Sequence, residues 1–473
     1  MTNQSTKPRR VAVVGGGITG LAAAHRLREL DPSLDVGLLE ASDHVGGLLQ
    51  TVRPDGYLVE RTADNFITNV PWAVDLCRRI GFYDQLIPTN EQHRQAFVVR
   101  AGRLEPVPRG FLLMSPSRIW PVLTTRILSP LGKARLLAER FVPPRRENSD
   151  ESVASFARRR LGREAFERLV QPLVGGIYTA DPEKLSILAT LPRFLETERR
   201  FGSLSRGRAT EDQPNQRSQS GPRYNLFMTP RDGMSSLVAA IAARLPADCI
   251  RLRTRVERIE RDGAGWKLWL TSGSHEPSST FECDAVILAL AASDSSQLLA
   301  PLDGELAAEL ARISSAGTAV VSAAYRRSQI GHPLGGFGFV VPAIEHRHIL
   351  AGSFSSVKFP GRAPADSVLI RAFVGGACQP LYAELPDDAL RDLVSAELRE
   401  LLDISGQPIF LDIARWPNSM PQYHVGHCEL VARIERRVET LAGLALAGNA
   451  YHGVGIPNCI HSGELAAERV LSH

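Results

Sequence analysis

A glycine-rich turn near the start of the chain constrains the fold more than any other feature. An apolar run at residues 11–14 leads into Gly15-Gly-Gly17-Ile-Thr-Gly20, and an alanine- and leucine-rich segment follows. This order predicts a strand, a tight turn at Gly15 and a helix packed closely at Gly20, with Gly17 open to a pyrophosphate. Amide groups at the start of such a helix bind phosphate. We therefore expect phosphate contacts from Gly15, Gly16, Gly17, Ile18, Thr19 and Gly20.

An acidic residue and a second pair of glycines follow the predicted helix. Residues 35–39 have the pattern of a short strand that ends at Glu40, 20 residues after Gly20. A carboxylate at this offset hydrogen-bonds the ribose of a bound dinucleotide. The pair Gly46-Gly47 resembles flavoproteins of the glutathione-reductase class, in which added glycines bring the backbone up to the ribityl-pyrophosphate. The pattern predicts FAD rather than NAD; the alternative is a glycine-rich turn without a ligand.

Length and composition limit the classes of protein to which the chain can belong. Its 473 residues exceed the usual size of a single core, so we expect two or three lobes. A hydrophobic content of 44%, a charged content of 22% and a net charge of +4 are ordinary for a globular protein and give no reason to expect nucleic-acid binding. The sequence shows no signal-peptide pattern and no run of 18 uncharged apolar residues, so we expect a cytoplasmic protein.

The cysteines and histidines predict no metal site. The six cysteines are scattered without a C-x-x-C motif, which argues against both a disulfide framework and a zinc ribbon. His424, His427 and Cys428 are close in sequence but lack a further set of ligands. For Cys459 we weigh a covalent-flavin or redox role against a small buried hydrophobe, and we expect the second.

Asp64 is the one candidate for a catalytic carboxylate. It lies in a polar turn that follows a short strand-like segment, residues 56–61. In that position it could accept a proton near a flavin. The alternative is a turn residue that hydrogen-bonds its own backbone.

A basic, partly apolar region follows at residues 100–146. It contains ten Lys and Arg against two acids, and apolar residues are interleaved with the charges. This pattern is typical of a lobe that lies on a membrane surface, and we predict peripheral membrane association. The alternative is a helical lobe whose arginines are simply solvated.

The order of segments predicts an α/β fold, α+β overall, with a Rossmann-like FAD-binding domain of the glutathione-reductase type. That domain is discontinuous because strand-like segments at 250–259, 266–270 and 283–290 return the chain to it. It carries an inserted mixed-sheet substrate domain and a helical lobe. Residues 202–222 have few apolar side chains and predict a disordered insertion. The expected parts are FAD binding at 1–90, 223–300 and 405–473, substrate binding at 91–110 and 301–404, and the helical lobe at 111–201.

Two further glycine segments carry candidate site residues. In residues 334–342 glycines flank Phe337, which lets a flat ligand approach the backbone; the alternative is a glycine-rich hairpin. Near the C-terminus a buried strand pattern ends in glycines, among them Gly448, Gly453 and Gly455, that open a helix. The amides of that helix could face the N1/O2 edge of a flavin and stabilise its anionic reduced form.

Taken together, these residues resemble the protoporphyrinogen oxidase family within the amine-oxidase-like FAD superfamily. General marks are the first glycines, Glu40, Gly46-Gly47, Arg415-Trp416 and the C-terminal glycine segment. More specific marks are the segments 171–186, 336–342, 359–364 and 453–457. The likeness runs along almost the whole chain except residues 202–222.

The resemblance implies site residues position by position. FAD contacts are implied at the first glycines and at Glu40, Ala41, Gly47, Leu48, Thr62, Ala63, Asp64, Asn65, Val256, Trp416, Gly448, Val454, Gly455 and Ile456. A porphyrinogen wall is implied at Phe337, Gly338 and Val340. The family usually has glycine where Thr62 stands. Some members have a propionate-binding arginine on the strand that holds Ala96, and it is missing here. Arg94, Arg100 or an arginine of the helical lobe is therefore expected to take that role, or the propionates are held differently.

The implied activity is oxidation of a porphyrinogen to a porphyrin in haem biosynthesis, with O₂ as oxidant and H₂O₂ as product. The substrate is coproporphyrinogen III or protoporphyrinogen IX, and the sequence does not decide between them. A ferrochelatase is an implied partner. Alternatives are an FAD-dependent amine oxidase or carotenoid desaturase, and a non-catalytic flavin-binding or membrane-scaffold protein.

Overall fold

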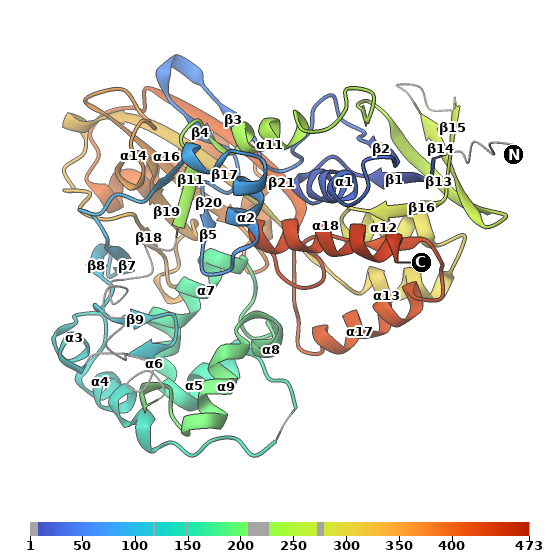
Figure 1. Cartoon of the computed structure of the whole chain (residues 1–473). Coiled ribbons are helices and arrows are strands. Elements are labelled where there is room, and N and C mark those ends of the chain that lie inside the picture. The colour runs from blue at the N-terminus through green and yellow to red at the C-terminus, as the bar shows by residue number, and fades with distance from the viewer. Residues whose placement is uncertain (1–7, 117–118, 148, 207–226, 272–278, 473) are drawn as a thin grey trace, which may run out of the picture.

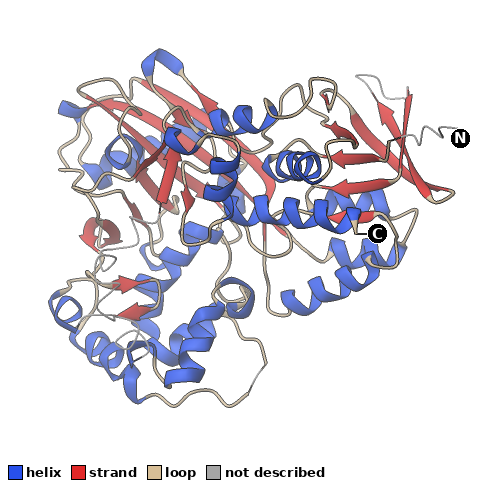
Figure 2. Ribbon diagram, viewed as in Figure 1, coloured by secondary structure: helices blue, strands red, loops and turns tan. Residues whose placement is uncertain are grey.

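The computed structural model describes residues 8–116, 119–147, 149–206, 227–271 and 279–472. Three lobes are visible in Figure 1. The first and last helices, α1 and α18, lie in one lobe with the first strands. A second lobe is built on a large sheet, and a third, below it, is helical (Figures 1 and 2).

The first lobe is built on a five-stranded parallel sheet with strand order β12-β2-β1-β16-β22. Its strands are β1 Arg10–Val14, β2 Asp35–Leu39, β12 Ile250–Arg251, β16 Ala285–Leu288 and β22 Leu444–Leu446. Because these strands come from distant parts of the chain, the lobe is discontinuous. Apart from the edge strand β12, the strands are mostly buried, as expected for a parallel sheet covered on both faces.

Helices cover this sheet on both sides. One layer consists of α1 Ile18–Leu30, α2 Trp72–Arg79, α11 Met234–Ala242 and α18 Ile456–Leu471. The other contains α12 Ala292–Leu299, α13 Gly304–Ala311, α17 His427–Val438 and the antiparallel sheet β13 Arg255–Asp262, β14 Gly265–Thr271 and β15 Ser279–Cys283. The α/β class and the Rossmann-like arrangement predicted from the sequence are confirmed.

The second lobe is built on a mixed seven-stranded sheet with strand order β21-β17-β20-β19-β18-β7-β8. Its strands are β7 Ala96–Arg100, β8 Arg103–Pro106, β17 Ser315–Arg326, β18 Gly338–Val340, β19 Ala351–Phe354, β20 Ser367–Gly375 and β21 Phe410–Pro421. Only β18 and β7 pair in parallel. Helix α16 (Asp387–Leu402) packs on one face through Leu390, Val394 and Leu398. The opposite face is therefore free to meet the other lobes.

Short strands connect the two sheets. They are β3 Thr51–Val52 paired with β4 Val59–Glu60, and β11 Phe227–Pro230 between β5 Phe66–Ile67 and β6 Leu86–Pro88. Two short helices, α14 Ser355–Lys358 and α15 Pro380–Ala383, border the large sheet.

Two expected domain boundaries differ from these pairings. The substrate domain was expected to start at 301, whereas Leu306 and Leu310 of α13 pack in the core of the nucleotide-binding lobe. Residues from 405 onward were expected in the FAD-binding part, whereas β21 pairs with β17 at the edge of the large sheet. Besides β7 and β8, the large sheet therefore takes its strands from residues 315–421. The expected boundaries differ because local sequence patterns do not reveal which strands pair.

The third lobe contains the basic region. Its elements are β9 Phe111–Leu112, β10 Ser115–Pro116, α3 Ile119–Thr124, α4 Pro130–Leu137, α5 Val153–Leu161, α6 Arg163–Ala165, α7 Gln171–Tyr178, α8 Ile187–Thr190 and α9 Pro192–Phe201. Of the predicted insertion 202–222, residues 202–206 are described, and Ser203 and Leu204 are buried. Residues 207–222 lie outside the described residues. In the described part of the chain, no helix is long and apolar enough to cross a membrane.

Candidate functional site: a nucleotide cradle facing the large sheet

The first glycine turn lies where β1 ends and α1 begins. Gly15 has φ +103° and donates its N–H to Leu39 O at 2.9 Å. A Cβ on Gly20 would overlap Gly15 O, so only glycine allows the helix to start this close to the strand. A Cβ on Gly17, by contrast, would have no atom within 4 Å. The start of α1 thus faces open space, as a pyrophosphate site requires.

Glu40 and the second glycine pair border the same turn. The Glu40 carboxylate accepts hydrogen bonds from Gly16 N at 2.6 Å and from Ser42 N at 2.8 Å. Gly46 N donates to Gly16 O at 2.8 Å, and a Cβ on Gly47 would lie 3.2 Å from Gly17 Cα. The two glycine segments expected to bind one dinucleotide therefore lie side by side.

Three other implied FAD contacts surround this region. Ala41 follows Glu40 directly, and Leu48, next to Gly47, exposes 40% of its surface. Val256 is buried at the start of β13, just after Thr254, whose N–H donates to Glu40 O at 2.8 Å.

The second predicted helix start is that of α18. Gly455 is its N-cap residue, Ile456 its first residue, and Val454 is half-buried. A Cβ on Gly463 would overlap Thr19 O, so α18 crosses α1 close to the start of α1. Since a helix rises 1.5 Å per residue, the start of α18 lies roughly 10 Å along the helix from that crossing. Two helix starts at this separation fit one extended dinucleotide, with the pyrophosphate at the start of α1 and the edge of the flavin ring at the start of α18.

The residues before α18 are held by side chains. Gly448 N donates to Ser462 Oγ at 3.0 Å, and Gly453 N donates to the Tyr423 hydroxyl at 2.8 Å. Burial raises the pKa of the Cys459 thiol to about 11. Because the thiolate is the reactive form of cysteine, this favours the structural role that the sequence indicated.

The predicted flavin turn, residues 62–65, is anchored by the large sheet. The carbonyl of Arg61 accepts a hydrogen bond from Trp416 Nε1 at 2.8 Å, and the carbonyl of Thr62 accepts one from the guanidinium of Arg371. The Thr62 hydroxyl donates to Leu48 O at 2.6 Å. The threonine that replaces the family's glycine therefore uses its side chain to join the turn to the second glycine segment.

Asp64 lies in a buried ion-pair cluster. Its carboxylate oxygens are 3.1 and 3.2 Å from Lys358 Nζ, one of them is 3.3 Å from Arg371 Nη1, and it also accepts a hydrogen bond from Asn65. Although burial raises the pKa of Asp64, the charges of Lys358 and Arg371 hold it at about 2. A carboxylate with this pKa is a weak base, which argues against proton acceptance by Asp64 and for a structural role.

Sequence reasoning missed Lys358 and Arg371. A signal for Arg371 was present, because it interrupts the apolar run 368–374 in the middle of a buried strand. A charged residue at such a position is almost never fully buried without a partner. Lys358 lies at the end of a four-residue helix, where no periodic pattern points to its partner.

The register of the large sheet brings the predicted flavin turn and two residues of the predicted porphyrinogen wall, Gly338 and Val340, to one face. Directly opposite residues form a row across six strands: Asp412, Ser322, Arg371, Ser353, Gly338 and Ala96. Paired residues point to the same face of a sheet. Asp412 forms an ion pair with Arg61 and Arg371 holds Thr62, so this face meets the turn. Arg371 and Gly338 are two strands apart, roughly 10 Å.

The next rows on this face are mostly apolar. One contains Ala414, Val320, Phe373, Ala351, Val340 and Val98. Beyond it Trp416 pairs with Thr318. An apolar surface between a flavin turn and a tryptophan suits a flat, largely apolar ligand. Of these residues, only Val340 and Trp416 were expected from the sequence.

The predicted wall residues lie in and beside β18. Phe337 is 5% exposed, and a Cβ on Gly338 would lie 2.9 Å from Ser353 Cα. Strand β19 can therefore approach β18 this closely only because residue 338 is a glycine. Val340 lies near Gly176 of α7, so the helical lobe closes over this end of the sheet. The structure thus has a strand here instead of an open loop.

The two candidate propionate-binding arginines differ in position. Arg94 precedes β7 and pairs with Glu91 at 2.5 Å. Arg100 ends β7 on the face that carries Ala96 and Val98, because alternate residues of a strand share a face. Of the two arginines, Arg100 is therefore the better placed to reach a ligand at the predicted wall.

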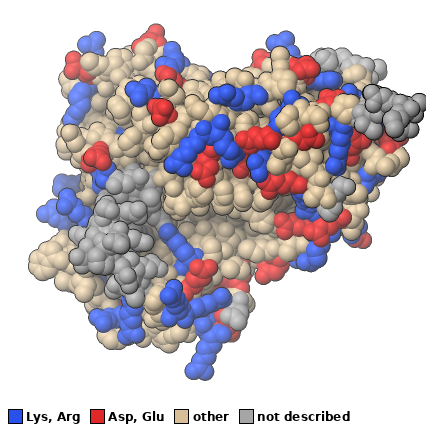
Figure 3. All heavy atoms as spheres, in the orientation of Figure 1, with Lys and Arg blue, Asp and Glu red and all other residues tan. Residues whose placement is uncertain are grey.

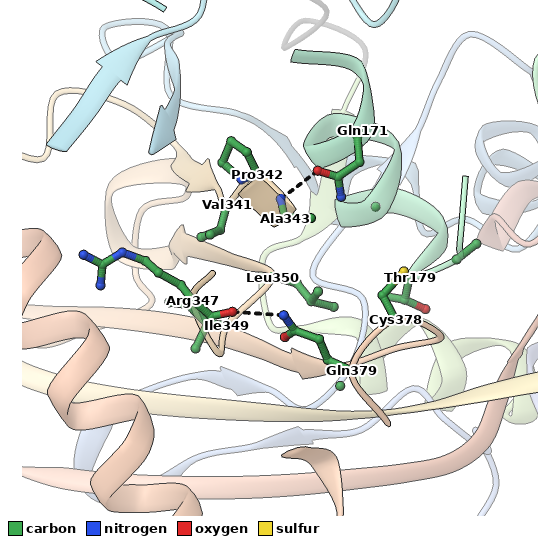
Figure 4. Close-up of a pocket in the computed structure, with 13 residues that line it drawn as sticks. Gln171, Thr179, Val341, Pro342, Ala343, Arg347, Ile349, Leu350, Cys378 and Gln379 are labelled. Carbon is green, nitrogen blue, oxygen red and sulfur yellow. Dashed lines mark hydrogen bonds between the residues drawn. The ribbon is translucent and has the colours of Figure 1, made fainter. Parts of the chain in front are cut away.

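Two cavities lie where the helical lobe meets the large sheet. Figure 4 shows the smaller one, about 30 Å³, where Gln171 of α7 accepts from Ala343 N at 2.9 Å and Gln379 donates to Arg347 O at 3.0 Å. The larger one, about 500 Å³, is lined by Trp416, Thr318 and Gly376, with Asp181 and Lys184 from the helical lobe. Phe337, Gly338 and Val340 do not line the larger cavity.

Comparison with known proteins shows the family to which the chain belongs. The model of the flavin-containing amine oxidoreductase family matches residues 18–471. The coproporphyrinogen III oxidase of Bacillus subtilis (strain 168) is 32% identical over 98% of this chain and 98% of that protein. The enzyme of the same name from Propionibacterium freudenreichii is 35% identical over 98% of this chain and 90% of its own length.

Solved structures give the same result. A protein from Exiguobacterium sp. 255-15 that carries the name protoporphyrinogen oxidase superposes with a TM-score of 0.88 and 29% identity, covering 99% of this chain and 100% of its own. Putrescine oxidase, with a TM-score of 0.69 and 17% identity over 98% of this chain and 99% of its own, shares the fold alone. This chain belongs to the flavin-containing amine oxidoreductases, in the group of the coproporphyrinogen and protoporphyrinogen oxidases.

Proposed function

We propose that this chain binds FAD and oxidises a porphyrinogen, with coproporphyrinogen III as the substrate. The observation that carries the proposal is the common sheet face: Arg371, which binds the carbonyl of Thr62, and Gly338 are two strands apart on it, roughly 10 Å. The choice of substrate rests on the bacterial coproporphyrinogen III oxidases, which are 32–35% identical, against 27–30% for the plant protoporphyrinogen oxidases.

The FAD site in this proposal runs from the first glycine turn to the start of α18. The amides at Gly17 and Ile18 bind the pyrophosphate, and Glu40 binds the ribose hydroxyls. The turn at 62–65 and Val454 would hold the flavin ring. The open space before Gly17 and the close packing at Gly20 support this placement.

The chain's own residues orient the substrate. The apolar row that includes Phe373 and Val340 packs against the macrocycle, and Arg100 pairs with a propionate. Bound FAD would supply the oxidation as three successive two-electron steps, because conversion of a porphyrinogen to a porphyrin removes six electrons, and three O₂ as final acceptors would give three H₂O₂. Because Asp64 is a weak base, the pyrrole protons leave to solvent. A ferrochelatase receives the porphyrin.

Porphyrin fluorescence tests this proposal. We expect the purified yellow protein in air to convert coproporphyrinogen III to coproporphyrin faster than it converts protoporphyrinogen IX, with H₂O₂ formed alongside. Equal rates, or a faster reaction with protoporphyrinogen IX, would reject the substrate choice. Turnover of a polyamine or a carotenoid without turnover of either porphyrinogen would reject the activity.

We propose also that the helical lobe docks on the cytoplasmic face of a membrane. Five large apolar side chains on α3, on α4 and just after α4 are exposed: Ile119 (60%), Trp120 (73%), Leu123 (44%), Leu131 (83%) and Phe141 (75%). Arg126 and Arg140 are exposed among them. Figure 3 shows Lys and Arg side chains gathered over the same lobe and a hollow between it and the rest of the molecule. Apolar anchors with basic neighbours suit an anionic lipid surface.

Co-sedimentation with anionic liposomes at low salt tests the docking surface. The double variant Trp120→Ser/Leu131→Ser is expected to bind at least about tenfold more weakly, because the loss of even one apolar side chain from lipid costs about 1.5–3 kcal/mol at full burial. Leu381→Ser is the matched control, because Leu381 is 75% exposed but lies on α15. Protein that stays in the supernatant at every lipid concentration, or a double variant that binds like the wild type, contradicts the proposal.

A further inference from the structure

A buried group of three charges lies behind the flavin turn. The side chains of Lys358, Asp64 and Arg371 are 15%, 11% and 1% exposed. They come from three distant segments: the end of α14, the turn itself and the middle of β20. Two cations and one carboxylate leave a net charge of +1 in a place where water does not screen it.

This cluster and Trp416 bind the turn only through its carbonyl oxygens and its carboxylate. Trp416 binds the carbonyl of Arg61, and Arg371 binds that of Thr62. Among the described residues, no acceptor is hydrogen-bonded by the backbone N–H groups of Thr62, Ala63 and Asp64. Thr62 and Ala63 are half-buried, and their N–H groups belong to the two peptide groups whose carbonyls are held, so these two amides are oriented and available for a ligand with acceptor atoms.

The direction of these groups has an electrostatic consequence. The carbonyl oxygens of these peptide groups face the sheet, and in a peptide group the N–H points opposite to the C=O. The amides therefore direct their partial positive charge away from the sheet. The net charge of Lys358 and Arg371 is also positive and adds to the positive potential at the turn. Fixed charge and fixed dipoles in a dry site favour the state of a ligand that carries more negative charge. A two-electron-reduced flavin is such a state.

We propose that Lys358 and Arg371, acting through Asp64, hold the turn at 62–65 as an amide cradle for the flavin ring and set how readily the flavin is reduced. Lys358 is thus a positioning residue that also supplies charge, without touching the substrate. The inference rests on the FAD site proposed above but is independent of which substrate is oxidised. Its rival is that the cluster serves only the stability of the fold.

The test compares Lys358→Gln with Lys358→Arg in the purified holoprotein. Sulfite is the probe, because its lone pair forms a bond to flavin N5 and leaves a negative charge on the ring. In Lys358→Gln we expect sulfite to bind on the order of tenfold more weakly and the reduction equilibrium, measured against a reference dye, to shift tenfold toward oxidised flavin. Lys358→Arg is expected to remain within about threefold of the wild type.

A matched control and a second variant complete the test. Arg347→Met cuts another partly buried ion pair of the same lobe, Arg347 with Glu397 at 2.8 Å, and is expected to change neither readout. Asp64→Asn removes the carboxylate charge and is expected to strengthen sulfite binding, which tests the inference even if Lys358→Gln does not fold. Wild-type sulfite affinity and reduction equilibrium in a folded Lys358→Gln, or in Asp64→Asn, overturn the inference. Neither readout needs a porphyrinogen, so failure here differs from failure of the proposed oxidation.

Discussion

A Gly20→Ala variant is expected to lose both its flavin and much of the stability of the nucleotide-binding lobe, whereas Gly17→Ala is expected to lose only the flavin. A Cβ at Gly20 would overlap the backbone oxygen of Gly15, so β1 and α1 would have to move apart. A Cβ at Gly17 would meet no protein atom within 4 Å, and Gly17 has φ −68°, which alanine adopts freely. It would, however, project into the space proposed for the pyrophosphate.

Flavin content and thermal unfolding separate the two effects. For Gly17→Ala we expect the affinity for FAD to fall at least about tenfold, since overpacking a site costs about 1–3 kcal/mol. Its apoprotein is expected to unfold at the wild-type temperature. For Gly20→Ala the apoprotein itself is expected to unfold several degrees lower. If Gly17→Ala retains wild-type FAD affinity, the pyrophosphate does not lie at this turn.

Glu139→Gln is expected to destabilise the helical lobe more than any other single change considered. Glu139 and Arg160 are both 0% exposed and form an ion pair. The Glu139 carboxylate also accepts hydrogen bonds from Leu204 N at 2.9 Å and from the Ser203 and Ser205 hydroxyls, both at 2.8 Å. Removing one charge of a buried pair costs about 3–5 kcal/mol when the other is left without a partner. Arg160 keeps Glu198, 3.3 Å from its Nη1, so we expect a cost near the lower end of that range.

An exposed pair is the control for Glu139→Gln. Glu183 pairs with Arg158 at the surface, where its side chain is 51% exposed, and Glu183→Gln is expected to cost at most about 1 kcal/mol. Thermal unfolding followed by circular dichroism measures both variants. If the unfolding temperatures of both variants fall by the same small amount, the buried pair contributes little to the stability of the lobe.

The same carboxylate makes the stability of the lobe depend on pH. Burial raises the pKa of Glu139, but the hydrogen bonds from Leu204 N and Arg160 outweigh it and lower that pKa below its usual value. A lowered pKa in the folded state means that this stabilisation is present above the ordinary glutamate pKa and is lost as the pH falls through the lowered one. The unfolding temperature of Glu139→Gln is therefore expected to change less between neutral and acidic pH than that of the wild type.

The nucleotide-binding lobe could be predicted in detail because its signals are local. The glycine turn, the start of α1 near Gly20 and the strand that ends at Glu40 all lie within one continuous segment, and the structure shows a steric reason for Gly15 and Gly20. The start of α18 was likewise readable from its glycines.

What the sequence did not show depends on pairing between distant segments. The membership of β21 in the large sheet, the packing of α13 and the partners of Asp64 each join residues far apart in sequence. The alternation of apolar and polar residues predicts which side of a strand is buried, but it does not predict which strand pairs with it. The face that Arg371, Gly338 and Ala96 share could therefore be found only from the register of the strands.

Anaerobic mixing of the oxidised protein with coproporphyrinogen III tests the central claim most directly. Absorbance reports the flavin, and porphyrin fluorescence reports the product. Oxidation by a flavin at this site predicts that the yellow colour bleaches in a single turnover without O₂ and returns when air is admitted. If neither coproporphyrinogen III nor protoporphyrinogen IX bleaches the flavin while the protein holds FAD, the proposed activity is wrong.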